Sequence, residues 1–168
     1  MKVLIQGLGI SPIPIELSLK YEKPDVCYVI CSDYQLNYKN NGKTNKEILT
    51  EAARKTRTDL VFKRCDVFDP RSIRNVLVEI LKKIDFSKDE LLFNYTSGSA
   101  PVRLFLGVFG AGISKFAKKT KVIYSISYKE EEMEVVNNHA PKLRELLPTE
   151  IDLLMDFCQM KLEKKRQR

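Results

Sequence analysis

The stretch TSGSAPVR, residues 96–103, carries side chains suited to binding a phosphate or a ribose. Four small residues, three of them with hydroxyl groups, stand together in it: Thr96, Ser97, Gly98 and Ser99. Hydroxyl groups and the backbone N–H groups at the start of a helix donate hydrogen bonds to phosphate oxygens. Arg103, one helical turn further on, adds a planar, charged pair of donors. A turn that merely caps a helix has the same composition, so both interpretations stay open.

A second stretch, GLGISPIP at residues 7–14, raises the question of a nicotinamide cofactor. A dinucleotide-binding turn reads Gly-x-Gly-x-x-Gly, and its third glycine lets the helix pack closely on the strand. The third position here is Pro12, so the pattern is broken, and the Gly-Lys-Ser/Thr of a Walker loop is absent as well. Gly9 then serves a tight turn, and Ser11 is predicted to cap the following helix. The N-terminus of that helix is predicted to bind an anion, which makes Gly9, Ser11 and Pro12 candidate ligand contacts.

Further candidates follow the next apolar run. Ser32 and Asp33 end it, and Asp33 lies near the distance at which a ribose-binding acid is expected, although acids at this position are common. Asp69, directly before Pro70, is predicted to cap a helix. His139 is the only histidine and is expected on the surface, so no Ser-His or Cys-His catalytic pair is expected.

The four cysteines predict neither a metal site nor disulfides. Cys27 and Cys31 share a strand-like run, and no second pair completes a set of four ligands. Buried, reduced thiols are expected. We expect no metal and no cofactor.

The elements that position these residues alternate regularly. Six apolar or β-branched runs predict strands, at residues 2–7, 25–32, 60–67, 90–96, 121–128 and 132–136, the last as an antiparallel hairpin strand. Between them, helical patterns lie at residues 15–23, 44–57, 70–84 and about 99–118, and terminal helices are expected after residue 140. This alternation predicts an α/β, Rossmann-like, doubly wound and mostly parallel sheet. Ligands of such sheets bind at the carboxyl ends of the strands, so the segments at 7–14, 32–43, 65–70 and 96–103 are where a site is expected.

Composition narrows the class of protein. A length of 168 residues and a hydrophobic share of 43% fit one globular domain, which we expect at 1–136, with a helical extension at 137–168. The sequence shows neither an apolar run of membrane-spanning length nor a signal peptide, so we expect a cytoplasmic protein. The net charge of +7 is concentrated at 115–121 and 161–168. It favours an anionic partner or simply solvated helix ends, and no zinc-finger, helix-turn-helix or aromatic RNA-binding pattern accompanies it.

Two of these stretches, in this order and spacing, resemble the CARF family, the CRISPR-associated Rossmann-fold domains. They are GISPIPIELSLKYEKPDVCYVICS at residues 9–32 and NYTSGSAPVR at residues 94–103, which looks like the family's Asn-x-Thr-Gly-Gly-Thr-Lys loop. Between them, DVFDPRSIRNVLVEILKKI at 66–84 is similar to the family's third strand exit and amphipathic helix. The resemblance covers about residues 1–136.

This resemblance implies a homodimer whose two strand-end surfaces form one symmetric pocket for a ring of four or six adenylates, the messenger of type III CRISPR defence. Family members are sensors joined to effector domains or stand-alone ring nucleases. Ring cleavage in the family needs no metal, because the ribose 2′-hydroxyl attacks the neighbouring phosphodiester while the protein supplies positioning and charge stabilisation.

Residue by residue, the resemblance gives Ser11 the role of the first-loop serine, and Thr96, Ser97, Gly98 and Ser99 the role of the phosphate loop. Ala100 departs from the family pattern, since many members have lysine there, and Arg103 is the nearest cation that can substitute. The helix that follows is apolar on nearly every face, with Gly107, Gly110 and Gly112, which fits core packing or a twin helix in a dimer equally well.

Two functions therefore compete. The first is a ring nuclease in which Ser11 and Arg103 are catalytic. The alternative is a non-catalytic cyclic oligoadenylate sensor that acts through a partner or DNA, favoured by Ala100 and by the basic C-terminus. An unrelated nucleotide-binding Rossmann-like enzyme is a third reading.

Overall fold

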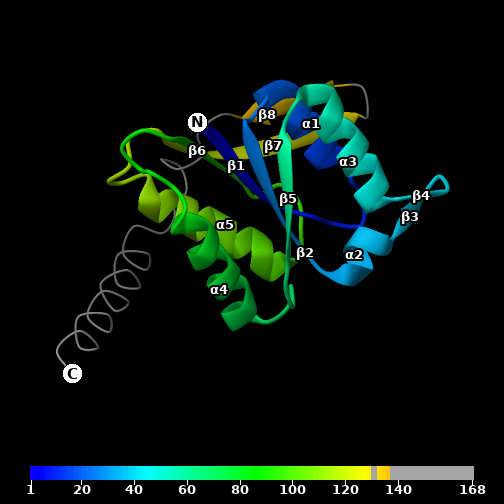
Figure 1. Cartoon of the computed structure of the whole chain (residues 1–168), viewed down its shortest axis with the longest axis horizontal. Helices are drawn as coiled ribbons and strands as arrows, with labels where there is room; N and C mark the ends of the chain where they lie inside the picture. The colour runs from blue at the N-terminus through cyan, green and yellow to red at the C-terminus, as the bar shows by residue number, and fades with distance from the viewer. Residues whose placement is uncertain (130–131, 137–168) are drawn as a thin grey trace.

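The centre of the fold is a single twisted sheet in the order β5-β2-β1-β6-β7-β8 (Figure 1). Five strands run parallel, and β8 pairs antiparallel with β7. The strands are β1 (Lys2–Gly7), β2 (Val26–Cys31), β5 (Asp59–Arg64), β6 (Glu90–Asn94), β7 (Thr120–Lys129) and β8 (Glu132–Val136). The Rossmann-like α/β fold and all six predicted strands are confirmed.

The computed structural model of the chain describes residues 1–129 and 132–136. The predicted terminal helices, the basic tail, His139 and Cys158 lie outside these residues. Within the described ranges, no helix is long and apolar enough to cross a membrane.

Helices cover both faces of the sheet, as buried parallel strands require. Figure 1 shows α1 (Ile13–Glu22) and α3 (Asn45–Thr56) on one face, and α4 (Pro70–Leu81) and α5 (Ala100–Ile113) on the other. Strand residues alternate between the two cores. Leu4 packs with the α1 and α3 side, whereas Val3 and Ile5 pack with the α4 and α5 side. The four predicted main helices are thus confirmed.

The helix α5 packs on the sheet through a glycine. A Cβ atom added to Gly110 would lie 2.6 Å from Val122 Cγ2 and 2.9 Å from Phe93 Cβ, so only glycine fits there. Of the two readings of this apolar helix, core packing accounts for its inner face. Its outer face still carries apolar side chains, with Leu104 61% exposed and Phe105 stacked on Phe109 at 5.9 Å.

The segment after β2, for which we predicted neither a helix nor a strand, has regular structure. It forms the short helix α2 (Asp33–Asn37) and a hairpin of β3 (Lys39–Asn40) and β4 (Lys43–Thr44). Asn41 and Gly42 turn this hairpin with φ of 49° and 84°. Asn-Gly favours such two-residue turns because both residues tolerate positive φ, so this signal was present in the sequence and was missed.

The free thiols of Cys27 and Cys31 are buried on β2, as predicted. Burial raises the pKa of each to about 12, so both stay protonated near neutral pH. Cys65 is also a free thiol and is half-buried. In the described part of the chain, no three His, Cys, Asp or Glu side chains group as metal ligands would.

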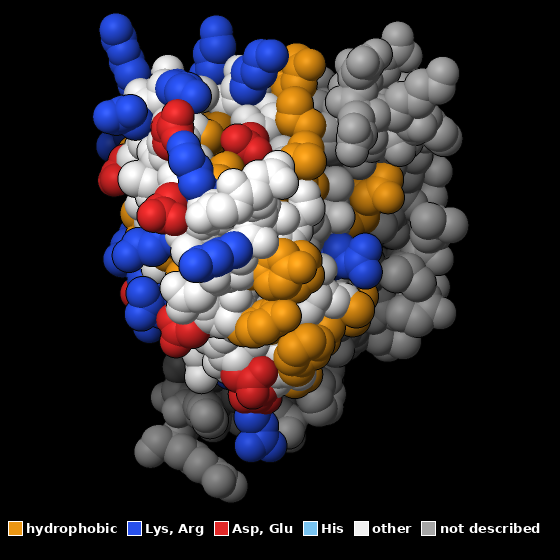
Figure 2. Space-filling model, turned by 90° about the vertical axis from the view of Figure 1, so that its right-hand side faces the viewer, with side chains coloured by type: hydrophobic (Ala, Val, Ile, Leu, Met, Phe, Trp, Pro, Cys, Tyr) orange, Lys and Arg blue, Asp and Glu red, His pale blue; other side chains and the backbone are white. Residues whose placement is uncertain are grey.

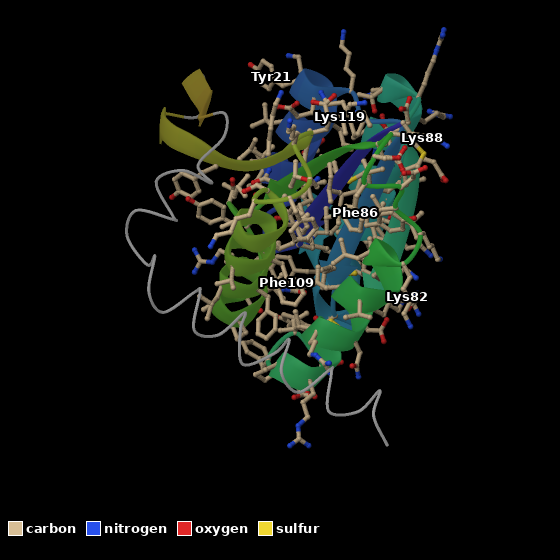
Figure 3. The ribbon with its side chains drawn as sticks, turned by 90° about the vertical axis from the view of Figure 1, so that its left-hand side faces the viewer. Tyr21, Lys82, Phe86, Lys88, Phe109 and Lys119 are labelled. Carbon is tan, nitrogen blue, oxygen red and sulfur yellow. The ribbon has the colours of Figure 1, made fainter. Side chains whose placement is uncertain are left out.

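Two lysines lie at the edge of the sheet where its strands begin, and Figure 3 labels both of them, Lys88 and Lys119. The Lys119 ammonium donates to the Lys88 carbonyl at 3.1 Å, and Lys88 pairs with Asp85 at 3.3 Å. The basic segment 115–121 therefore lies at the opposite end of the sheet from the loops where a ligand site is expected.

Candidate functional site

The two glycine-bearing loops predicted to bind a ligand lie against each other. The first loop, residues 8–12, joins β1 to α1, and the second loop, residues 95–99, joins β6 to α5. Because β1 and β6 are neighbours, the two loops leave the same edge of the sheet side by side. A Cβ on Gly9 would lie 3.7 Å from the backbone nitrogen of Gly98. This is the switch point of the sheet order, where open α/β sheets bind their ligands.

A buried polar network underlies both loops. Gln6 and Asn94 face each other in the register of β1 and β6 and are almost wholly buried. Asn94 Nδ2 donates to Gln6 Oε1 at 3.3 Å and to Ser18 Oγ on α1 at 2.7 Å, while Asn94 Oδ1 accepts the Thr96 N–H at 3.0 Å. Gln6 Nε2 completes the network by donating to Cys27 Sγ at 3.3 Å. Because buried polar groups need partners, the network fixes the relative position of the two loops and of α1.

The first loop enters α1 differently from our prediction. The N-cap is the buried Pro12, and Ser11 lies one residue before it, so the prediction that Ser11 is the cap was wrong. The exposed Ser11 Oγ accepts the Ile13 N–H at 3.3 Å. No described residue accepts the hydrogen of its hydroxyl group, which leaves that hydrogen available to a ligand.

The N-terminus of α1 is also a poor anion site, contrary to expectation. Pro12 and Pro14 have no N–H group, and the Ile13 N–H is held by Ser11. The Ile15 N–H donates to the Pro12 carbonyl at 2.9 Å. Of the N–H groups that a helix N-terminus normally offers, two are missing because the residues are prolines, and two are already bonded within the protein.

The first loop is held from outside by two asparagines that the sequence analysis did not single out. Asn45 is fully buried at the start of α3, and its Nδ2 donates to the carbonyls of Ile10 at 2.9 Å and Gln35 at 2.8 Å. Asn40 Nδ2 donates to the same Ile10 carbonyl at 3.1 Å and to Asn45 Oδ1 at 2.7 Å. The segment from α2 to β4 is thus a brace for the first loop. Only the Asn-Gly hairpin signal could have pointed to it.

The hydroxyl groups of the second loop donate inward, to the protein. Thr96 Oγ1 donates to Asn94 Oδ1, Ser97 Oγ to the Gly7 carbonyl at 2.5 Å, and Ser99 Oγ to the Val67 carbonyl. Ser99 is also the N-cap of α5 and accepts the Val102 N–H at 3.4 Å. A phosphate accepts hydrogen bonds and offers none in its ionised form, so these hydroxyl groups cannot donate to it while the loop keeps this conformation.

The backbone of the second loop supplies the donors instead. The N–H groups of Gly98, Ser99 and Ala100 have no acceptor within residues 1–129 and 132–136. They come directly before the first turn of α5, whose dipole favours negative charge. Gly98 has φ of +111°, a conformation that suits glycine, so the backbone of the turn accounts for a glycine at this position.

Arg103 lies one turn into α5, where its N–H donates to the Ser99 carbonyl at 3.0 Å. Its side chain is exposed, and no carboxylate of the described residues pairs with it. A free guanidinium beside unpaired N–H groups gives this end of α5 a positive potential.

Ser32 and Asp33 have structural partners in α2. Ser32 is its N-cap, accepting the Gln35 N–H at 3.2 Å in a capping box. Asp33 Oδ1 pairs with Arg64 Nε at 3.2 Å, and both side chains are exposed. Their link to the first loop runs through the Gln35 carbonyl that Asn45 holds. A role for either residue in ligand binding stays a prediction.

Large apolar side chains are exposed on the loops and on the first turns of the helices around the site: Ile10, Ile13, Tyr34, Phe68 and Leu104. Figure 2 looks at the side of the molecule where α2 and the β3–β4 hairpin lie in Figure 1, and it shows apolar side chains gathered on this face beside cationic ones. Donors for an anion, the exposed guanidinium of Arg103 and apolar surface together suit a ligand with both phosphates and flat bases.

No protein-family model matches the sequence, and no curated protein matches it either. Solved structures do resemble the fold. The chain superposes on Csm6 of Enterococcus italicus, bound to cyclic hexa-2′-fluoro-hexa-dAMP, with a TM-score of 0.58 and 14% identity over 77% of this chain. It superposes on Can2 from Sulfobacillus thermosulfidooxidans, in complex with cyclic tetra-adenylate, with a TM-score of 0.51 and 16% identity over 80% of this chain.

The matched region covers 35% of the Csm6 chain and 36% of the Can2 chain, so this chain spans about a third of either protein. At identities this low, the superpositions establish a shared fold. Both proteins contain CARF domains. The Rossmann-like sheet of this chain, with its glycine loops paired at the switch point, is therefore a CARF-like domain fold.

Proposed function

We propose that the chain binds a cyclic oligoadenylate at the paired loops, as a cytoplasmic protein of type III CRISPR defence. The observation that carries the proposal is the pairing of the first and second loops at the switch point, with the N–H groups of Gly98, Ser99 and Ala100 unpaired among the described residues. Two structures with this fold hold a cyclic adenylate ligand, which supports the choice of ligand.

The proposed unit is a homodimer. One copy offers a single set of loops, and a ring of repeated nucleotides matches a two-fold axis that brings two sets together. The exposed Leu104 and the stacked Phe105 and Phe109 on α5 give such a dimer an apolar surface next to the loops. Light scattering is expected to show twice the 19.4 kDa of the chain, and a monomer at micromolar concentration contradicts the dimer.

The finer proposal is that the protein cleaves the ring. The ribose 2′-oxygen would attack the adjacent phosphorus, the bond from phosphorus to the 5′-oxygen would break, and the proton of the 2′-hydroxyl would pass to the leaving 5′-oxygen. This leaves a 2′,3′-cyclic phosphate. Ser11, with its free hydroxyl hydrogen, and Arg103 are the side chains that we propose hold and stabilise the phosphate as charge develops.

A second candidate is a sensor that binds the ring and leaves it intact, passing the signal to a partner or to DNA. It is favoured by the inward-donating hydroxyl groups of Thr96, Ser97 and Ser99 and by Ala100, which brings no cation to the loop.

One experiment tests both candidates. The protein is titrated with cyclic tetra-adenylate and cyclic hexa-adenylate in the presence of EDTA, binding is followed by calorimetry, and products are resolved by chromatography. Binding with conversion to linear products supports the nuclease, and binding with the ring intact supports the sensor. Thermal stabilisation by NADH but by neither ring would overturn the proposal.

A further inference from the structure

Phe68 is the most exposed of the large hydrophobic side chains in the described part of the chain, at 73%. It lies in the loop from β5 to α4, which leaves the same edge of the sheet as the two ligand loops. A phenylalanine side chain exposed to water does not stabilise the fold, although single exposed apolar residues are common. Its position is what sets it apart.

The backbone on both sides of Phe68 is fixed. Before it, Val67 is buried and its carbonyl accepts the hydroxyl hydrogen of Ser99, the N-cap of α5. After it, Asp69 caps α4 by accepting the N–H groups of Arg71 at 3.1 Å and Ser72 at 3.2 Å. The Phe68 N–H itself donates to Asp66 Oδ1 at 2.9 Å. The ring is therefore presented to solvent from a loop with little freedom to withdraw it.

The Ser99 hydrogen bond also places Phe68 next to the candidate anion site. Ser99 contributes one of the unpaired N–H groups with its backbone and holds the neighbour of Phe68 with its side chain. A ligand phosphate at those N–H groups would have its attached nucleoside within reach of this loop.

The charges around Phe68 favour a base over a phosphate. Asp66 and Asp69 flank it, and both carboxylates are held in the loop by backbone N–H groups. Carboxylates repel a phosphate, whereas the exocyclic amine of adenine is a hydrogen-bond donor. The phenyl ring offers a flat apolar face on which any base can stack.

We infer that Phe68 is a base-stacking residue, taking the face of an adenine whose phosphate lies at the Gly98, Ser99 and Ala100 N–H groups. The inference rests on the proposed function and adds a position that neither glycine loop contains.

The chain has no tryptophan, so Phe68→Trp introduces a single fluorescent indole at the proposed contact. Phe116 is the matched control. It is 65% exposed, packs edge to face on Phe86 at 6.2 Å, and belongs to the far edge of the sheet, where Figure 3 labels Phe86.

Titration with cyclic tetra-adenylate and cyclic hexa-adenylate is expected to quench the fluorescence of Phe68→Trp and to leave that of Phe116→Trp unchanged. Phe68→Ala is expected to weaken affinity for the ring about 5- to 150-fold, the range for losing one stacked base, with an unaltered unfolding midpoint. Phe116→Ala is expected to bind as the natural protein does.

The outcomes distinguish a failure of the stacking role from a failure of the proposed function. If the natural protein binds a ring while Phe68→Ala binds equally well and Phe68→Trp is not quenched, the stacking role is wrong and the proposed function stands. If the natural protein binds neither ring, the proposed function fails and the stacking role fails with it.

Discussion

Gly7 and Gly98 pack backbone against backbone. A Cβ atom built on Gly98 would lie 3.2 Å from Gly7 Cα, and one built on Gly7 would lie 3.1 Å from Gly98 Cα and 2.8 Å from the Ser97 carbonyl oxygen. The end of β1 and the loop that follows β6 can therefore approach this closely only because both residues lack a side chain. The first glycine of GLGISPIP is needed for contact with the other loop, whatever the ligand.

Gly98→Ala is predicted to destabilise the fold more than Gly42→Ala. Both glycines have positive φ, so each substitution carries a backbone cost of about 1–2 kcal/mol. A Cβ on Gly42 meets nothing within 4 Å, whereas one on Gly98 meets Gly7 Cα and Val102 Cγ1 at 3.2 Å. Urea unfolding gives the loss of stability in each variant, and the difference between the two reports the cost of crowding Gly98 against Gly7. Equal losses of stability would mean that the loops part easily.

Ser11→Ala is predicted to weaken ring binding or cleavage about tenfold or more while leaving the unfolding midpoint nearly unchanged. Its hydroxyl group holds only the Ile13 N–H within the described residues, at 3.3 Å, and its hydrogen is free. Ser97→Ala is the matched comparison, because the Ser97 hydroxyl donates to the Gly7 carbonyl. It should cost about 1 kcal/mol of stability. Ring affinity and urea unfolding of both variants check this, and a Ser11→Ala protein with full binding and cleavage contradicts the assigned role.

Gly9→Ala is predicted to fold normally and to bind the ring poorly. The added methyl group would lie 3.7 Å from the Gly98 nitrogen, which is ordinary contact in the free protein. It would crowd any phosphate oxygen that accepts the Gly98 N–H. Calorimetric titration checks the affinity, and Arg103→Ala, which removes the exposed cation without adding bulk, provides the comparison. Full affinity in both variants would place the ligand elsewhere.

Asn45→Ala is predicted to lower the free energy of unfolding by about 1–3 kcal/mol and to weaken ring binding. It removes, at a fully buried position, the side-chain donor to the Gln35 carbonyl and one of the two side-chain donors to the Ile10 carbonyl. Asn40→Ala removes a second donor to Ile10 from a more exposed position and should cost less. Measured unfolding free energies rank the two. An Asn45→Ala protein as stable as the natural one would show that the brace is dispensable.

The order of elements could be predicted from the sequence because periodicity reports which faces are buried. The strand 2–7 and the helix at 70–84 were recognised by apolar spacing and by Pro70 after Asp69, which does cap α4. Hydrogen-bond direction could not be predicted in this way. Serine and threonine in TSGSAPVR predict donors, but whether they face a ligand or the carbonyls of Gly7 and Val67 depends on segments tens of residues away.

Thiol chemistry is predicted to be slow for Cys27 and Cys31. A pKa of about 12 leaves about one thiol in ten thousand ionised at pH 8, and the thiolate is the reactive form. The raised pKa of both thiols also makes the stability of the fold depend on pH. The unfolded chain ionises these thiols above pH 9.0, while the folded chain keeps them protonated, so stability should fall as pH rises from 9.0 toward 12. Alkylation mapped by mass spectrometry and urea unfolding at pH 8 and 10 check both effects. Rapid labelling of Cys27 in the folded protein contradicts them.

The hydrogen bond from Ser97 to Gly7 joins residues 90 positions apart, and the paired residues of β1 and β6 are 88 positions apart. During synthesis, the first sixty or so residues can form only the β5-β2-β1 half of the sheet, with one edge of β1 unpaired. The first loop then lacks its partner, and long-range pairing of this kind is slow. The capacity to bind a ligand should therefore arise late in folding and in one step, when β6 docks. A refolding experiment would see ligand protection only after most of the helical signal has returned.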